Sequence, residues 1–71
     1  MKPIEIKTEY ITLGQFLKLA DCISTGGQAK PFLSETAIFV NDVAENRRGR
    51  KLYRDDRVQV EGCGDFVVTR R

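Results

Sequence analysis

The sequence predicts an α+β fold, with two short helices packed on a small antiparallel sheet. Apolar residues follow helical spacing from Leu13 to Ile23 and again around Phe32. From Ala37 onward the apolar spacing changes to two, which is typical of strands. The chain has 71 residues and an apolar fraction of 41%, which suits one domain over residues 1–71. An order of strand, helix, helix and then several strands is typical of the α+β class.

The N-terminal part predicts one strand followed by a helix. Residues 3–11 begin with an alternation at Ile4 and Ile6, which indicates a short strand at a sheet edge. Thr12 and Gln15 have the spacing of a capping box, so we expect a helix over about residues 12–23. Its apolar stripe consists of Leu13, Phe16, Leu17, Ala20 and Ile23.

A second short helix is expected over about residues 27–35. The glycine pair Gly26-Gly27 ends the first helix, and Gly27 is the expected cap of the second. Ala29, Phe32 and Leu33 repeat at helical spacing. Pro31 lacks a backbone donor, so the helix can begin only shortly before it.

The second half of the chain predicts strands joined by polar segments. Ile38 and Val40 share one face of a strand, and Asn41-Asp42 forms a turn because both residues tolerate positive φ. The polar, basic residues 45–51 are expected to form a loop. Clean alternation predicts a strand over residues 57–61, and a hairpin turn at 62–65 then leads into a last strand at 66–69.

Composition argues against catalysis and against a metal site. The chain has no histidine to activate a nucleophile, and Asp55-Asp56 is expected to be a solvated turn. Two cysteines without histidine cannot supply four zinc ligands. The N-terminus lacks an apolar signal core and no apolar run approaches a membrane span, so we expect a cytoplasmic protein without cofactor or membrane contact. In that setting Cys22 and Cys63 are expected to be free thiols.

Two stretches are candidates for contact with a polyanion. The net charge is only +2, but six basic residues lie between Arg47 and Arg57. The stretch NRRGRK could neutralise phosphates, or it could be a solvated loop. The stretch STGGQAK lacks the complete nucleotide-binding loop pattern. It could accommodate one backbone phosphate, or it could be only a bend between helices.

Taken together, these stretches resemble the RNA-binding domain named after bacterial small-subunit ribosomal protein S-four, also called the alpha-L motif. The family's Arg-Leu-Asp-x-x-Leu aligns with residues 12–17, where the leucines match and Thr12 replaces the arginine. The family's Ser-Arg aligns with Thr25-Gly26, and its Gly-x-Val-x-Val-Asn-Gly aligns with residues 36–42, which keep Asn41. The closing Gly-Asp-x-Val aligns with residues 55–58.

The sequences GGQAK and NRRGRK resemble one branch of this family, the small stand-alone bacterial proteins of the YaaA and YbcJ type. The resemblance implies non-catalytic binding of structured RNA, with ribosomal RNA as the expected class and a ribosome-associated or assembly role. The one-signed charge of NRRGRK motivates the hypothesis that loop cations supply the charge of the family's two missing arginines. The implied RNA-binding residues are Thr25, Gly27, Gln28, Lys30, Asn41, Arg47, Arg48, Arg50 and Lys51.

Shape and phosphate contacts are expected to dominate, because no Phe/Tyr pair occupies alternating positions of one strand as a base-stacking platform would. We expect a monomer. One alternative is a protein-interaction module whose basic loop binds an acidic partner. Another is a ubiquitin-like sulfur carrier, which the absence of a C-terminal Gly-Gly disfavours.

Overall fold

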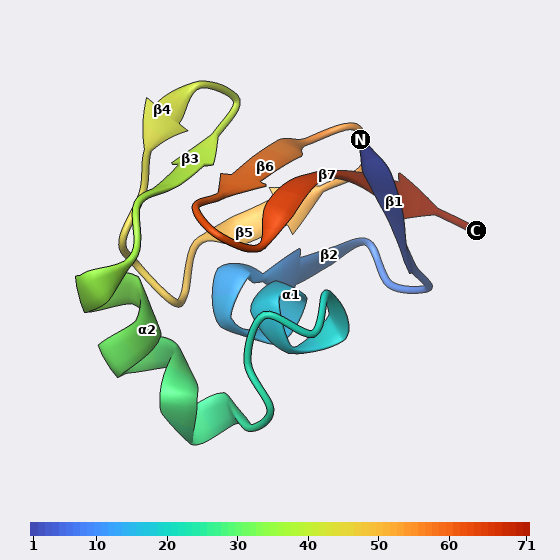
Figure 1. Cartoon of the computed structure of the whole chain (residues 1–71). Helices are drawn as coiled ribbons and strands as arrows, with labels where there is room; N and C mark the ends of the chain where they lie inside the picture. The colour runs from blue at the N-terminus through green and yellow to red at the C-terminus, as the bar shows by residue number, and fades with distance from the viewer.

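A five-stranded sheet is the largest element of the computed structural model, which describes all residues from Met1 to Arg71 (Figure 1). Its strand order is β1-β7-β6-β3-β4. The bounds are Lys2–Ile6 for β1, Ile38–Val40 for β3, Val43–Ala44 for β4, Arg57–Val60 for β6 and Gly64–Arg70 for β7. The α+β prediction is confirmed. The sheet is mixed, however, because β1 runs parallel to β7 while the other neighbours are antiparallel.

The predicted N-terminal strand is two strands. β1 lies at the sheet edge, as expected, and β2 (Tyr10–Thr12) leaves this sheet to pair with β5 (Lys51–Tyr53). These two strands form a separate antiparallel sheet, in which Tyr10 is opposite Tyr53 and Thr12 is opposite Lys51. Lys51 therefore belongs to a strand, and the predicted loop ends one position earlier.

The first helix, α1 (Leu13–Leu19), begins where the capping box predicted. The Thr12 N–H donates to Gln15 Oε1 at 3.0 Å, and the Gln15 N–H donates to Thr12 Oγ1 at 3.3 Å. The helix ends earlier than predicted because Asp21 adopts a φ of 60°. The N–H of Cys22 then bonds to the carbonyl of Leu17 at 2.9 Å, which completes a Schellman ending.

The second helix is preceded by a tight turn. Gly26–Gln28 form one 3₁₀ turn, η1, and α2 follows at Ala29–Glu35. The expected cap, Gly27, lies inside η1. Pro31 lies in the first turn of α2, where its missing donor removes no intrahelical bond.

One apolar core joins the helices to the sheet. Phe16 of α1 and Phe66 of β7 are buried and meet edge to face, with ring centroids 5.6 Å apart. Val58 and Val60 alternate inward along β6, as the sequence predicted. Each such side chain contributes about 1.5–3 kcal/mol by leaving water. None of the helices is long and apolar enough to cross a membrane.

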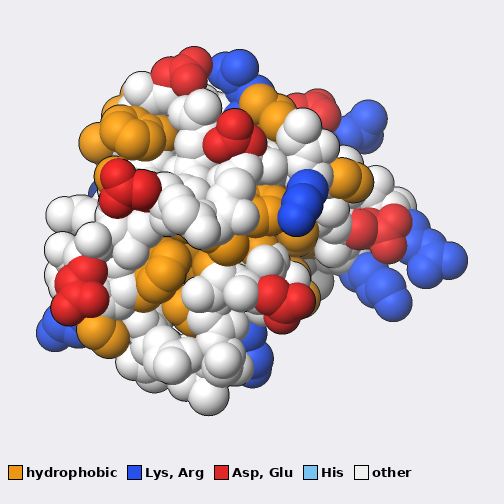
Figure 2. Space-filling model, in the orientation of Figure 1, with side chains coloured by type: hydrophobic (Ala, Val, Ile, Leu, Met, Phe, Trp, Pro, Cys, Tyr) orange, Lys and Arg blue, Asp and Glu red, His pale blue; other side chains and the backbone are white.

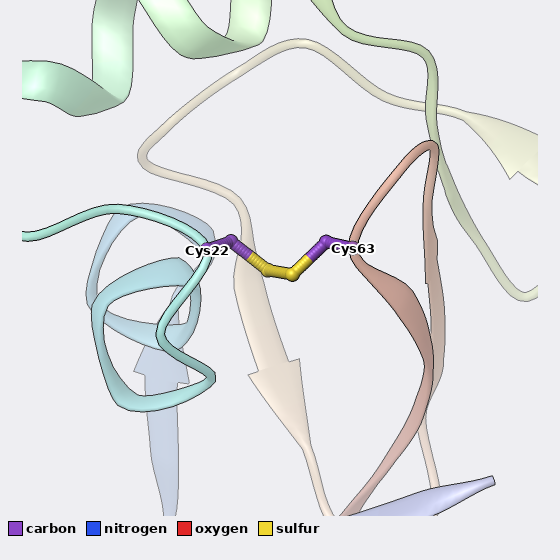
Figure 3. Close-up of a disulfide and its surroundings, with 2 residues drawn as sticks. All are labelled: Cys22 and Cys63. Atoms are coloured by element: carbon purple, nitrogen blue, oxygen red, sulfur yellow. A yellow bond between two sulfur atoms is a disulfide. The ribbon is translucent and has the colours of Figure 1, made fainter.

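The prediction of free thiols is wrong in this structure, because Cys22 and Cys63 form a disulfide (Figure 3). The turn that ends α1 presents Cys22 toward Cys63, which lies in the turn between β6 and β7. Their Cα atoms are 5.9 Å apart. The sequence argument weighed only the cellular compartment, whereas the fold brings together two residues 41 positions apart.

Candidate nucleic-acid interface

The basic loop, defined here as residues 47–51, is bonded to the start of α1. The Leu13 N–H donates to the carbonyl of Arg50 at 2.8 Å, and the Gly14 N–H donates to the carbonyl of Arg48 at 2.9 Å. These are N–H groups of the first helical turn, which have no partner within the helix. The loop backbone is therefore fixed against α1, and its side chains project from a defined position.

Gly14 marks the point where the two candidate stretches meet. A Cβ placed on Gly14 would lie 3.5 Å from the carbonyl oxygen of Arg48 and 3.6 Å from the Cβ of Ala29. Arg48 belongs to the basic loop, and Ala29 begins α2 directly after η1. The fold thus brings NRRGRK and STGGQAK side by side at the first turn of α1.

A buried carboxylate that sequence reasoning missed organises the basic loop. Glu45 is only 9% exposed, and its Oε2 accepts hydrogen bonds from the N–H groups of Asn46 and Arg47. The same carboxylate accepts from Arg47 Nε at 3.0 Å, from Arg47 Nη2 at 3.1 Å and from Arg50 Nη1 at 2.8 Å. The only available signal was one acid two positions before a run of cations.

These contacts change the acidity of the carboxyl group. The hydrogen bond from the Arg47 side chain is the largest cause, and with the bond from Arg50 it outweighs the opposing effect of burial. Together they lower the pKa of Glu45 from 4.5 to about 2. The same pairing raises the pKa of Arg47 above its ordinary value.

The loop cations therefore fall into two groups. Arg47 and Arg50 are paired with Glu45, although the Arg47 side chain is still 72% exposed. Arg48 and Lys51 make no ion pair, and neither does the exposed Lys30 at the start of α2. The unpaired cations are the ones whose charge is free for an external anion.

The turn STGGQAK is held by its own glutamine. Gln28 Oε1 accepts hydrogen bonds from the N–H groups of Ser24 at 2.7 Å and Thr25 at 3.1 Å. A Cβ on Gly26 would meet nothing within 4 Å, and one on Gly27 only Thr25 Oγ1 at 4.0 Å. The turn thus leaves its glycine backbone open on the surface, and the Gln28 oxygen is already used.

Asn41 is likewise engaged inside the protein. Its Nδ2 donates to Asp56 Oδ1 at 3.0 Å, and its Oδ1 accepts from the Arg57 N–H at 2.9 Å. Asp56 Oδ2 also accepts from the Tyr53 N–H at 2.7 Å. The predicted turn at Asp55-Asp56 is confirmed, but Asp56 is half-buried and hydrogen-bonded rather than simply solvated.

An open groove of about 580 Å³ lies beside the basic loop. Its lining consists of Arg47, Gly49, Arg50, Lys51, Tyr53 and Asp56. Cations, a tyrosine and a hydrogen-bonded carboxylate therefore line the same groove.

Tyr53 belongs to an aromatic pair that sequence reasoning missed. It lies opposite Tyr10 across β2 and β5, with ring centroids 5.7 Å apart, and Lys51 Nζ lies 4.9 Å from the Tyr10 centroid. The search for aromatic residues along one strand could not find a pair made by two strands. Pairing of β2 with β5 was not apparent from local sequence.

Figure 2 shows a face on which acidic and apolar side chains are scattered, while most Lys and Arg side chains lie around its outline. The positive charge of this nearly neutral protein is thus unevenly placed. This face does not present a continuous basic surface.

Comparison with known proteins agrees with the arrangement of elements. The family model described as "S4 domain" matches residues 4–69. The chain is also similar to a protein of Bacillus subtilis (strain 168) named "Probable ribosome maturation protein RlbA". The two are 65% identical over 66 residues, which cover 93% of each chain.

Proposed function

Because this chain belongs to the S4 domain family, we propose that it binds structured RNA without catalysis, with ribosomal RNA as the ligand class and ribosome maturation as the setting. The name of the Bacillus relative supports the setting, and its high identity over nearly the whole chain makes a shared role reasonable. The observation that carries the proposal is the meeting of the basic loop and the start of α2 at Gly14.

Some residues of the proposed interface contact RNA, and the others hold those residues in place. Lys30, Arg48 and Lys51 contact RNA phosphates, because they form no ion pair within the protein. The backbone at Thr25 and Gly27 is exposed and admits close approach of a phosphate. Recognition of this kind reads the shape and backbone of folded RNA, since the deep major groove of an RNA helix is hard to reach.

The remaining proposed site residues act mainly by holding this surface in place. Gln28 fixes the turn before α2, and Asn41 holds Asp56 at the edge of the groove. Arg47 and Arg50 are anchored by Glu45 but keep donors near the surface. Their partial pairing lowers, without removing, the positive charge offered to RNA.

Lys51 takes the place of a family arginine in this proposal. The family's first arginine aligns with Thr12, and Thr12 is paired directly opposite Lys51 across β2 and β5. Directly opposite residues of an antiparallel pair have Cβ atoms about 4.5–5.5 Å apart. The Lys51 side chain can therefore reach the RNA phosphate that an arginine at residue 12 would contact.

A binding titration with ribosomal RNA fragments at low and moderate salt tests the proposal. The test variant is Lys30→Gln with Arg48→Gln, which removes two unpaired cations and no internal ion pair. The control is Arg70→Gln with Arg71→Gln, which makes the same charge change at the end of β7, across the molecule from α2 (Figure 1).

We expect the test variant to bind RNA much more weakly and with a shallower salt dependence, whereas the control binds like the wild type. Each lost phosphate contact reduces the slope of log K against log salt by about 0.7–0.9. Equal losses in both variants would mean non-specific attraction. If the wild type binds no folded RNA, the result favours the alternative function, an interaction module with an acidic protein partner.

The proposal describes a monomer, because the interface is contained in one chain. Light scattering of the free protein and of its RNA complex gives the stoichiometry directly. A dimer in the free state would contradict this part of the proposal alone.

A further inference from the structure

The outer face of β2 and β5 carries exposed aromatic surface beside the basic loop. Tyr10 and Tyr53 are 39% and 45% exposed, and they lie side by side, with ring centroids 5.7 Å apart. Alternation along β5 buries Leu52 and puts Lys51 and Tyr53 on this outer face together. Two partly exposed rings and a cation thus share one outer face of this small sheet.

The rings of Tyr10 and Tyr53 do not cover each other's faces fully. Their planes are inclined by 44° and their centroids are 5.7 Å apart, so they do not form a parallel stack. That spacing is also too small to hold a base between them, since two stacking distances of about 3.5 Å would be needed. Tyr53, which lines the groove and is 45% exposed, is therefore the ring available for stacking.

The groove is lined by groups that together suit one nucleotide. Arg47, Arg50 and Lys51 line it together, and they attract phosphate. Asp56 lies in the same groove, where its carboxylate repels phosphate but accepts hydrogen bonds from base amino groups. Tyr53 is held beside Asp56 by its N–H, which donates to Asp56 Oδ2 at 2.7 Å. A base stacked on Tyr53 would thus have its phosphate toward the basic loop.

We propose that this groove binds one unpaired nucleotide of the RNA, with its base stacked on the ring of Tyr53 and its phosphate held by Lys51 and the neighbouring arginines. The inference rests on the proposed RNA binding and adds a ligand feature to it: a bulged or looped-out base next to a helix. Tyr10 supports the site as a positioning residue, because its ring fixes the ammonium of Lys51 at 4.9 Å.

The composition of the chain provides a direct readout. Tyr10 and Tyr53 are the only two tyrosines, so incorporation of 3-fluorotyrosine gives two fluorine NMR signals. Tyr10→Phe and Tyr53→Phe assign them. The probes are an RNA hairpin with one bulged adenosine, the same hairpin without the bulge, and tripolyphosphate as an anion without bases.

We expect the bulged hairpin to shift the Tyr53 signal more than the paired hairpin does, and tripolyphosphate to leave it nearly unchanged. We also expect Tyr53→Ala to weaken binding of the bulged hairpin about 5- to 150-fold, which is the usual range for loss of one stacked base. Tyr53→Phe keeps the ring and should bind like the wild type. Thermal unfolding of each variant checks that the exposed substitution leaves the fold intact.

Three results would overturn the stacking site. One is an equal shift of the Tyr53 signal by both hairpins, and another is an equal loss of affinity for both in Tyr53→Ala. The third is unchanged affinity in Tyr53→Ala, while the Lys30→Gln, Arg48→Gln variant loses binding to both hairpins. In that third case RNA binding itself survives. If the wild type binds neither hairpin, the result contradicts both the proposed RNA binding and the proposed stacking site.

Discussion

Glu45 accepts two hydrogen bonds from the guanidinium of Arg47, at 3.0 Å from Nε and 3.1 Å from Nη2. Because Glu45 is buried and Arg47 is exposed, the pair ties a surface loop to the interior. Such charge-assisted, two-point contacts have defined geometry. A loop of like charges, which would otherwise repel one another, is held in one conformation before any ligand arrives.

This pairing predicts a loss of stability in acid. The pKa of Glu45 is about 2 in the folded protein, against an ordinary value of 4.5. The folded state therefore binds this proton less readily than the unfolded chain, so the stabilisation is complete above about pH 4.5 and declines as pH falls toward 2. Urea unfolding between pH 6 and pH 2.5 measures the decline.

Glu45→Gln isolates this group from the other carboxylates. We expect the variant to be less stable than the wild type by about 1–3 kcal/mol at pH 6, because it loses an ion that is hydrogen-bonded and shielded from water. The difference should shrink steadily below pH 4.5. A difference that stays constant down to pH 2.5 would show that the charge of Glu45 does not stabilise the loop.

Arg47 and Arg48 should respond differently to the same substitution. Arg47→Gln breaks the pairing with Glu45, so we expect lower stability as well as weaker RNA binding. Arg48→Gln removes a cation without an internal partner, so we expect weaker RNA binding with a melting temperature close to that of the wild type. Thermal unfolding and an RNA titration on both variants compare them. Equal stability losses would contradict the division between anchored and free cations.

Asn41 is expected to stabilise the fold through both its backbone and its side chain. Its φ is 51°, and its side chain joins Asp56 to the N–H of Arg57. Asn41→Ala should cost about 1–2 kcal/mol from the left-handed backbone alone, with lost hydrogen bonds in addition. Asn41→Gly relieves the backbone cost and removes only the side-chain bonds. Urea midpoints in the order wild type, Gly and Ala would agree; equal stability of the Gly and Ala variants would not.

Removing the disulfide should lower stability without altering the basic loop. The bond between Cys22 and Cys63 closes a segment of 41 residues. In the chain-entropy view, a closure of this length stabilises by about 4 kcal/mol. We expect the Cys22→Ser, Cys63→Ser protein to melt at a clearly lower temperature, and the reduced wild type to behave like it. A wild type whose melting temperature is unchanged by reduction would contradict this.

Local patterns in the sequence predicted the elements that depend on neighbouring residues. The capping box at Thr12 and the turn at Asn41-Asp42 occur where expected, because both are built within four residues. The alternation that buries Val58 and Val60 is also local. These features follow from backbone geometry alone, so no knowledge of the tertiary fold was needed.

Features that depend on distant contacts were missed. Glu45 is buried only once its backbone bonds to Ile38 of β3 in the folded chain, and the pairing of Tyr10 with Tyr53 requires β2 and β5 to meet. The bond between Cys22 and Cys63 likewise joins two turns from opposite ends of the chain. The candidate cations could be found from charge alone, but which of them are free could not.

The position of β7 bears on how the chain folds as it is made. β7 follows every other strand in sequence, yet it lies between β1 and β6 and contributes the buried Phe66 and Val68. Neither β1 nor β6 can complete its pairing until β7 has emerged from the ribosome. The contacts between β1 and β7, which are far apart in sequence, are also slow to form. The nascent chain should therefore complete this sheet and its core only once β7 has been synthesised.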